Sequence, residues 1–391
     1  MKSIRDIPLK GKRVLLRADF NVPMNDQKQI TDDLRIRMVL PTIRHILKEK
    51  GRLVICSHMG RPKGKRIEEF SLAPIARHIE SLLGEKVTLA PDCIGGEVEA
   101  IVEKMTEGEI VLLENLRFHA EETENDPAFS EQLARLADVY INDAFAVSHR
   151  AHASVVGVAD RIAEKAAGFL LQTEMDYFHK SMDAPARPLV AVIGGAKVSS
   201  KLGALENMLG KVDRMIIGGA MANTFLKSIG VDVGASKIED DLLENARQFI
   251  DAADARGIKL YLPVDFVAAD RFAADAITKN VTSKEIPTGW MALDIGPAST
   301  ILFKEALEDA KTIIWNGPMG AFEMDAFSRG TMAMCQNIAS SHALSIVGGG
   351  DSSAAVKKSG EERNISYMST GGGAFLELME GKTLPGVDAL G

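Results

Sequence analysis

"RLVICSHMGRPKG", residues 52–64, joins an apolar run directly to a loop that is rich in glycine and positive charge. A short apolar run that ends at such a loop is typical of a strand buried on both faces of a parallel sheet. An amphipathic helical pattern at 38–51 precedes the run, and Gly51 ends that pattern. The stretch therefore predicts a helix followed by a buried strand, with His58 and Arg61 just beyond the end of the strand.

The same alternation of short apolar runs and amphipathic helices extends along the whole chain. Strands are expected at 13–18, 52–57, 86–90, 109–115 and 138–143 in the first half, and at 188–195, 214–219, 259–264, 312–317, 344–350 and 366–370 in the second. Near-continuous apolar strands that alternate with helices predict parallel sheets covered on both faces. The predicted fold class is α/β, with two doubly wound domains in sequence.

Length and composition agree with two domains and exclude several functions. The chain has 391 residues, whereas a single hydrophobic core stops growing at roughly 250–300. Its formal net charge is −8, which argues against nucleic acid as a partner. Its three cysteines, at 56, 93 and 335, show no spacing typical of disulfides or zinc ligands. No signal peptide and no apolar stretch of roughly 18 residues is visible, so we expect a cytoplasmic protein without membrane spans.

The expected divider between the domains is the stretch at 166–188. Its first two-thirds follow a helical pattern and its end is rich in proline and alanine, which predicts a helical connector and not a flexible linker. We expect a first domain at 1–168, a connector helix at 169–185, a second domain at 186–370 and a C-terminal segment at 371–391.

Basic side chains follow four strand-like segments of the first half. Ligands of open parallel sheets bind beyond the carboxyl ends of the strands, so these side chains should share one rim. A rim of arginine and histidine suits a small anion with phosphate or carboxylate groups. Any single arginine is more often a solvated surface residue or a member of an ion pair, and His149 and His152 could be structural, so it is the four strand ends together that favour a site. The rim residues are Asp19, Asn21, Arg35, Arg37, His58, Arg61, Arg117, His149, Arg150 and His152.

Glycine-rich loops follow the strands of the second half, at 193–201, 217–223, 315–323, 347–355 and 369–375. Glycine permits close approach of the backbone, and a helix N-terminus offers free N–H groups to phosphate. Ordinary strand-to-helix turns use the same residues, so the repetition of the pattern is what favours a nucleotide-phosphate site. The P-loop spacing fails at "GRPKGKR" (60–66), and the dinucleotide fingerprint fails at "GGGAFL" (371–376).

Eight motifs, taken together and in order, resemble the phosphoglycerate kinase family from end to end. They are "RADFNVP" (17–23), "SHMGRPKG" (57–64), "ENLRFHAEE" (114–122), "INDAFAVSHRAHAS" (141–154), "GGAKVSSKL" (194–202), "WNGPMGAFE" (315–323), "GGGDSS" (348–353) and "STGGGAFLELMEGKTLPGVDAL" (369–390). The resemblance implies reversible phosphoryl transfer between 1,3-bisphosphoglycerate and MgADP in glycolysis, giving 3-phosphoglycerate and MgATP. It also implies a monomer with two Rossmann-like domains, whose C-terminal segment returns to the first domain.

The resemblance implies roles for individual residues. Asp19, Asn21, Arg35, His58, Met59, Gly60, Arg61, Arg117 and Arg150 would bind the phosphoglycerate. Lys197, Lys201, Asn316, Glu323, Gly349, Gly350, Asp351 and Ser352 would hold the nucleotide, with Asp351 near Mg²⁺. A threonine is common in the family where this chain has Ser352, and both residues offer a hydroxyl group.

The expected chemistry needs no general base. The acceptor in the ATP-consuming direction is a carboxylate with an ordinary pKa of about 4, so it is already ionised at pH 7. Charge on the moving phosphoryl group would be dispersed by Arg35, Lys197, Lys201, Mg²⁺ and the N–H groups of Gly371 and Gly372. Because the reacting atoms must come within about 3–3.5 Å, we expect the domains to close by a hinge at the connector.

Two other functions fit parts of the pattern. A different nucleotide-dependent kinase would keep the glycine-rich half and use the basic rim for another small phosphorylated acid. A non-catalytic binding protein with two domains would close on an anion. Lys201 and Asp351 argue against this reading, because a pure anion binder has no use for a carboxylate placed to hold magnesium.

Overall fold

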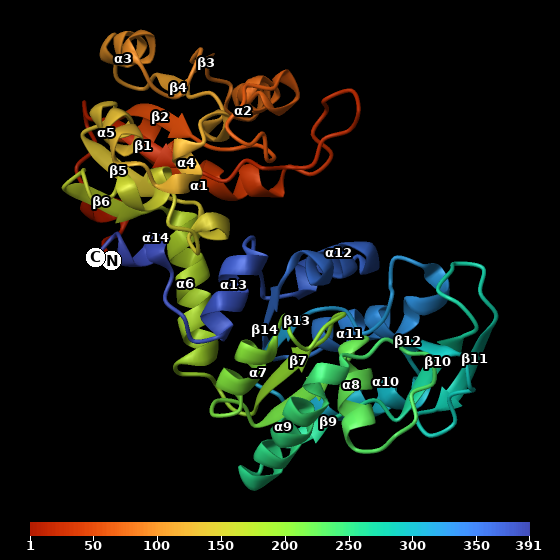
Figure 1. Ribbon diagram of the computed structural model, residues 1–391. Coiled ribbons are helices and arrows are strands. Elements are labelled where there is room, and N and C mark those ends of the chain that lie inside the picture. Colours follow the sequence, from red (N-terminus) through yellow and green to blue (C-terminus); the bar gives the residue numbers. More distant parts are fainter. The chain divides into compact units, whose positions relative to one another are not determined.

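The computed structural model describes residues 1–391 as two compact units, each built on a six-stranded sheet (Figure 1). The first unit comprises Met1–Asp176 and Thr383–Gly391, and the second comprises Tyr177–Lys382. All strand pairs within the two six-stranded sheets are parallel. The predicted α/β class with two parallel sheets is confirmed.

The first sheet is organised around β1, Arg13–Arg17, which lies between β2 and β5. The strand order is β3-β4-β2-β1-β5-β6. The chain adds strands on one side of β1 and then crosses to β5 on the other side, so the ends of β1 and β5 flank a topological switch point. The remaining strands are β2 (Arg52–Cys56), β3 (Val87–Leu89), β4 (Ile110–Leu112), β5 (Val139–Asn142) and β6 (Glu164–Ala167).

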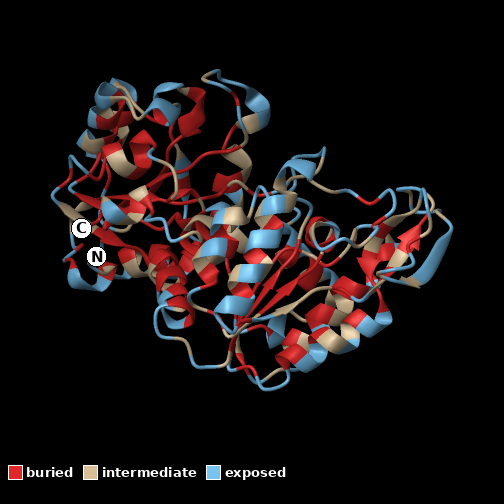
Figure 2. Cartoon of the chain, turned by 60° about the horizontal axis from the view of Figure 1, so that its bottom comes forward, coloured by how far each residue is buried: buried red, intermediate tan, exposed pale blue.

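The longer helices of the first unit bury one apolar face, as α2 illustrates, whereas the short α4 buries only Glu122. Ile75, Ala76 and Ile79 of α2 are buried, and Gly84 ends the helix in the left-handed conformation. Figure 2 shows the same division between buried sheets and helices with one exposed face. The helices are α1 (Leu34–Lys48), α2 (Ala73–Leu83), α3 (Gly96–Glu103), α4 (Glu121–Glu124), α5 (Pro127–Arg135) and, in the C-terminal segment, α14 (Pro385–Asp388).

The second sheet repeats this plan around β7, Leu189–Ile193, which lies between β13 and β8. Its order is β15-β14-β13-β7-β8-β9, so the switch point lies between β7 and β13. The other strands are β8 (Arg214–Ile217), β9 (Lys259–Tyr261), β13 (Thr312–Asn316), β14 (Leu344–Gly348) and β15 (Tyr367–Met368). The helices are α7 (Leu202–Met208), α8 (Met221–Ser228), α9 (Leu243–Ala255), α10 (Pro297–Leu307), α11 (Arg329–Ala339), α12 (Gly350–Ser359) and α13 (Gly372–Met379).

The sequence analysis missed two parts of the strand pattern. A small antiparallel sheet in the second unit pairs β10 (Asp265–Ala269) with β11 (Thr278–Thr282) and β12 (Met291–Ile295). β11 is almost entirely exposed, so it has no apolar run to reveal it. The edge strand β6 has the sequence "EKAA" and likewise contains no apolar run.

Helix α6, Phe169–Met182, is continuous, and the division between the units falls within it at Asp176. The C-terminal residues Thr383–Gly391 belong to the first unit, where Asn142 Nδ2 donates to Gly386 O (3.1 Å). Helix α13 belongs to the second unit, although the expected C-terminal segment began at 371. The expected domain ranges remain a prediction. None of the helices combines the length and apolarity needed to cross a membrane.

The start of α6 is held by a buried carboxylate. Asp143 Oδ1 accepts a hydrogen bond from Leu171 N (3.0 Å), and Asp143 is fully buried. A Cβ atom at Gly168 would lie 2.3 Å from Asp143 Cγ, so the approach of this loop to the carboxylate requires glycine. Burial raises the pKa of Asp143 to about 7.

Asp143→Asn should change how the stability of the protein depends on pH. The pKa of Asp143 is raised to about 7 by folding, so its stabilising contribution is present at low pH and is lost as pH rises through 7. When the pH is raised from 5 to 8, the wild type should lose roughly 1–3 kcal/mol more unfolding free energy than the asparagine variant. Urea denaturation at both pH values measures this difference. The exposed Asp160→Asn is the control, and an equal effect in both variants would refute the assignment.

Candidate functional site

The loop after β1 and the first turn of α1 are joined by an ion pair. Arg35 Nη1 donates to Asp19 Oδ2 (2.9 Å) and to Asn21 O (3.1 Å). Asn21 N donates to Asp19 Oδ1 (3.0 Å). Asp19 is buried, whereas the Arg35 side chain is 34% exposed. The guanidinium group of Arg35 is therefore fixed at the end of β1 and still accessible to solvent.

The loops after β2 and β4 are tied to the same end of the sheet. Gly60 N donates to Asn21 Oδ1 (2.9 Å), and Arg117 Nη1 donates to Gly60 O (2.8 Å). Asn115 Nδ2 donates to Met59 O (2.8 Å). Gly60 has a φ of +61°, and a Cβ atom there would lie 2.4 Å from the Phe70 ring, so this position requires glycine.

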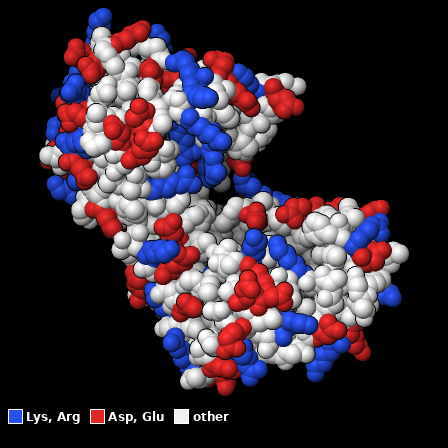
Figure 3. All heavy atoms as spheres, viewed as in Figure 1, with Lys and Arg blue, Asp and Glu red and all other residues white.

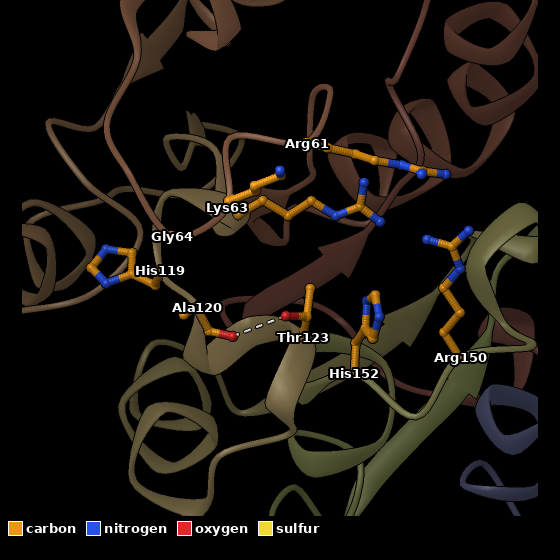
Figure 4. A pocket seen from close by; sticks show the side chains of 9 residues that line it. Arg61, Lys63, Gly64, His119, Ala120, Thr123, Arg150 and His152 are labelled. Atoms are coloured by element: carbon orange, nitrogen blue, oxygen red, sulfur yellow. Dashed lines mark hydrogen bonds between the residues drawn. The ribbon is translucent and has the colours of Figure 1, made fainter.

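A cavity of about 410 Å³ lies beside these loops in the first unit. In Figure 4, Arg61, Arg150 and His152 point toward one space, whereas the ring of His119 points away from it. Figure 3 shows Lys and Arg gathered in a strip on the visible face of this unit. The nine residues predicted for the phosphoglycerate thus lie in one connected region. The cavity is lined by Arg61, Lys63, Gly64, Arg117, His119, Ala120, Thr123, Arg150 and His152.

A buried polar chain behind the cavity was missed by the sequence analysis. Arg17 Nε donates to Ser154 Oγ (2.8 Å), and Ser154 Oγ donates to Glu122 Oε1 (2.7 Å). Ser154 N donates to Glu122 Oε2 (2.9 Å). Arg17 Nη2 lies 3.3 Å from His58 Nδ1. The available signal was Arg17 itself, a charged residue at the end of the apolar run Val14–Leu16.

Burial decides the charge of the ionisable groups in this region. It lowers the pKa of His58 well below the usual 6.5, with the positive charge of Arg17 as the next cause. It lowers the pKa of His152 to about 3 and that of Arg117 to about 10, again followed by the charge of Arg17. Burial also raises the pKa of Glu122, while Arg17 opposes that rise. At neutral pH the two histidines are neutral, and the positive charge of the region is carried by arginine.

Three groups of a kind that ligates metals also meet in the first unit. Ligand atoms of Asp92, Cys93 and His119 all lie within 4.8 Å of one another. His119 Nε2 and Asp92 Oδ1 are 2.8 Å apart, which pairs the imidazole with the carboxylate directly. The sequence analysis missed this group because Asp92 and His119 lie on separate loops.

The second unit places Lys201 and Asn316 together at the β7–β13 switch point. Lys201 Nζ contacts Asn316 Oδ1 and donates to Asn316 O (3.3 Å). Burial lowers the pKa of Lys201 to about 8, and the charge of Asp351 opposes that change. Gly317 has a φ of +100°, and a Cβ atom there would lie 2.2 Å from Gly194 O, so only glycine lets the two loops approach this closely.

The N-termini of two helices lie beside this pair. Gly349 has a φ of +98° and precedes α12, whose Ser352 accepts a hydrogen bond from Gly317 N at Oγ (2.6 Å). A Cβ atom at Gly372, the first residue of α13, would lie 3.1 Å from the Cα atom of Gly349. Gly371 is the N-cap of α13. The start of α12 therefore lies next to Asn316, the partner of Lys201, and the start of α13 lies next to the start of α12, so free backbone N–H groups of both helices are available in this region.

A largely apolar cavity of about 530 Å³ adjoins these loops. Its carboxylates are Glu323 and Asp351, both predicted for the nucleotide site. Lys197 is exposed in the loop after β7 and does not line this cavity. Residues around the antiparallel sheet, which the sequence analysis missed, form part of the wall. The lining comprises Gly195, Ala196, Gly219, Ala220, Ala235, Lys237, Phe272, Met291, Ala292, Leu293, Pro318, Gly320, Ala321, Glu323 and Asp351.

Two α/β units with an arginine-lined cavity in one and a glycine-bordered cavity in the other are typical of a kinase that acts on a small anion. The family model described as "Phosphoglycerate kinase" matches residues 4–382. The chain therefore belongs to the phosphoglycerate kinase family. It is a phosphotransferase with a carboxyl group as acceptor, EC 2.7.2.3, and it acts in glycolysis.

Individual relatives that are named phosphoglycerate kinase match this chain over nearly its full length. It is 74% identical to the phosphoglycerate kinase of Desulfotalea psychrophila over 390 residues, covering 100% of both chains. It is 56% identical to that of Citrifermentans bemidjiense over 382 residues, covering 98% of this chain and 96% of the relative. The solved structure of phosphoglycerate kinase from Coxiella burnetii matches with a TM-score of 0.91 at 41% identity, covering 100% of this chain and 98% of that one.

His152→Gln should make the protein less sensitive to acid. The pKa of His152 is lowered to about 3 by folding, so its stabilising contribution is complete above pH 6.5 and is lost as pH falls toward 3. Between pH 7 and pH 5 the wild type should lose roughly 1–2 kcal/mol more unfolding free energy than the glutamine variant. Urea denaturation at both pH values tests this, with the exposed His342→Gln as control. If the two histidine variants behave alike, His152 does not carry the effect.

Proposed function

We propose that the arginine–histidine region of the first unit binds the phosphoglycerate substrate, with Asp19, Asn21, His58, Met59 and Gly60 shaping the site around the arginines. The observation that carries this proposal is the convergence on one rim of Arg35, from the first turn of α1, with Arg61, Arg117 and Arg150, from three separate segments that follow strands. Charge-assisted bonds from guanidinium groups to phosphate or carboxylate each contribute roughly 1.5–3 kcal/mol, so a few of them hold a small anion.

The nucleotide would bind in the second unit, with its phosphates at the N-terminus of α12. Gly349, Gly350 and Ser352 offer backbone N–H groups there, and Lys201 adds a positive charge next to Asn316. The apolar wall of the adjoining cavity suits a flat base, and Glu323 borders that cavity. Lys197 would reach the phosphates from its exposed loop.

Asp351 would hold the Mg²⁺ that accompanies the nucleotide. The donor chemistry fits, because Mg²⁺ prefers oxygen ligands and the Asp351 carboxylate is exposed on the cavity that Glu323 also lines. When bound, the ion would neutralise part of the phosphate charge.

Within this proposal, the protein acts by positioning and by electrostatic stabilisation. The carboxylate acceptor needs no base, and no side chain of the region is arranged to remove a proton from it. Arg35 and Lys201 would stabilise charge on the transferred group, together with N–H groups of Gly371 and Gly372. Transfer requires the two substrates to approach, so the units would close by a hinge in the connector at 169–185. We further propose that the enzyme is a cytoplasmic monomer.

Arg35→Ala should lower kcat by roughly 10³-fold, by analogy with arginine residues that stabilise phosphoryl transfer in other enzymes. The Kd for ADP should stay nearly constant, because Arg35 lies in the first unit. A coupled assay of ATP formation from 1,3-bisphosphoglycerate and MgADP gives kcat, and calorimetry gives the Kd. Arg37→Ala, on the same helix but paired with Asp33, is the control. An unchanged kcat for Arg35→Ala would remove this residue from the mechanism.

Nucleotide affinity should fall above pH 8 and become insensitive to pH in Lys201→Arg. The pKa of Lys201 is about 8 in the free protein, and bound phosphates would raise it. Above pH 8 the neutral Lys201 must therefore take up a proton when ADP binds. Relative to its value at pH 7, the Kd for ADP should rise roughly tenfold by about pH 9 to 9.5. Arginine keeps its charge over this range. Calorimetry at pH 7, 8 and 9.5 measures the effect, and equal losses in both proteins would exclude Lys201 as the titrating group.

A further inference from the structure

We propose that Glu122 is a positioning residue that acts through Ser154 and Arg17 to hold His58 in one tautomer, with the proton on Nε2. The proposal rests on the proposed role of His58 in binding the phosphoglycerate. It adds a residue that has no contact with the substrate but determines which hydrogen bond His58 can offer.

The argument begins with the direction of the hydrogen bonds. Arginine only donates, so the bond from Arg17 Nε makes Ser154 Oγ an acceptor, and the hydroxyl proton is left to point at Glu122 Oε1. For the same reason, the 3.3 Å contact between Arg17 Nη2 and His58 Nδ1 makes Nδ1 the acceptor. A neutral imidazole that accepts at Nδ1 carries its proton on Nε2, which can donate to an anion.

Burial makes this arrangement rigid. Arg17, Ser154 and Glu122 are fully buried and His58 is 2% exposed, so no solvent replaces a lost partner. The remaining Arg17 nitrogen, Nη1, donates to Ala18 O, and all three nitrogen positions of the guanidinium group are therefore used. The groups facing His58 are positive apart from Asp19, whose Oδ1 lies 3.8 Å from His58 Nδ1. Of these two neighbours of Nδ1, only Arg17 Nη2 lies within hydrogen-bond distance, at 3.3 Å, so the contact with Arg17 makes Nδ1 an acceptor.

The carboxylate of Glu122 cannot be replaced by an amide without disturbing this chain. Ser154 presents two donors, its backbone N–H to Oε2 and its hydroxyl to Oε1, and both require an acceptor. In Glu122→Gln one of these oxygens becomes an NH₂ donor. With the NH₂ group in the place of Oε1, the Ser154 hydroxyl must turn and its bond with Arg17 is weakened. With the NH₂ group in the place of Oε2, the backbone N–H of Ser154 loses its acceptor and the loop that carries the hydroxyl must shift. His152 Nδ1, 3.7 Å from Glu122 Oε1, also loses its charged neighbour.

The test compares Glu122→Gln and Ser154→Ala with the wild type, using the exposed Glu124→Gln on the same helix as control. Long-range ¹H–¹⁵N NMR of histidine-labelled protein reports the tautomer directly, and loss of signals in His58→Gln assigns His58. We expect the Nε2–H pattern in the wild type and in Glu124→Gln. In Glu122→Gln and Ser154→Ala it should be lost or mixed with the other tautomer.

Kinetics give the second readout. In Glu122→Gln the KM for 3-phosphoglycerate should rise roughly tenfold, while kcat and the KM for ATP change less than about twofold. Ser154→Ala should behave in the same way, which keeps the proposal testable if one variant folds poorly. Thermal unfolding identifies such a variant.

The possible outcomes separate the two proposals. An unchanged His58 tautomer in folded Glu122→Gln and Ser154→Ala overturns the positioning role, whatever their kinetics. An altered tautomer with an unchanged KM for 3-phosphoglycerate supports the positioning role and refutes the proposed contact between His58 and the substrate. An altered tautomer together with a raised KM supports both.

Discussion

The parallel hydrogen bonding of β1 and β7 to a neighbour on each side is the constraint on which the rest of the structure depends. β1 pairs in register with β2 and β5, and β7 pairs in register with β13 and β8. Parallel pairing brings the carboxyl ends of successive strands to one edge, although the residues that follow them are far apart in sequence. Arg17 is thereby aligned with Cys56 and Asn142, and Ile193 with Asn316.

The two units create attraction for anions in different ways. The first uses charged side chains. Burying them costs free energy, and two carboxylates offset part of that cost: Asp19 pairs with Arg35, and Glu122 lies in the electric field of Arg17. The second uses backbone N–H groups at helix N-termini, which require glycine where loops approach one another closely. This difference supports the proposal that the small anionic substrate binds in the first unit and the phosphate chain of the nucleotide in the second.

The sequence predicted the architecture better than the interior of the site. Apolar runs such as "RLVIC" carry enough information to assign buried parallel strands, and the residues that follow them were predicted as ligand-binding. The chain from Arg17 through Ser154 to Glu122 was not predicted, because its members lie 137 and 32 positions apart and only folding brings them together. The antiparallel sheet escaped because an exposed strand such as β11 has no hydrophobic period.

The sequence by itself determined the α/β class, the two parallel sheets and the residue types available at each strand end, since hydrophobic period and glycine placement are local properties of the chain. Tertiary structure alone decided the protonation and orientation of those residues. Burial keeps His58 and His152 neutral and lowers the pKa of Lys201 to about 8. It also excludes solvent from Arg17, so the guanidinium group can donate only to protein acceptors such as Ser154 Oγ. These properties depend on desolvation and on neighbours distant in sequence, and neither exists before the chain is folded.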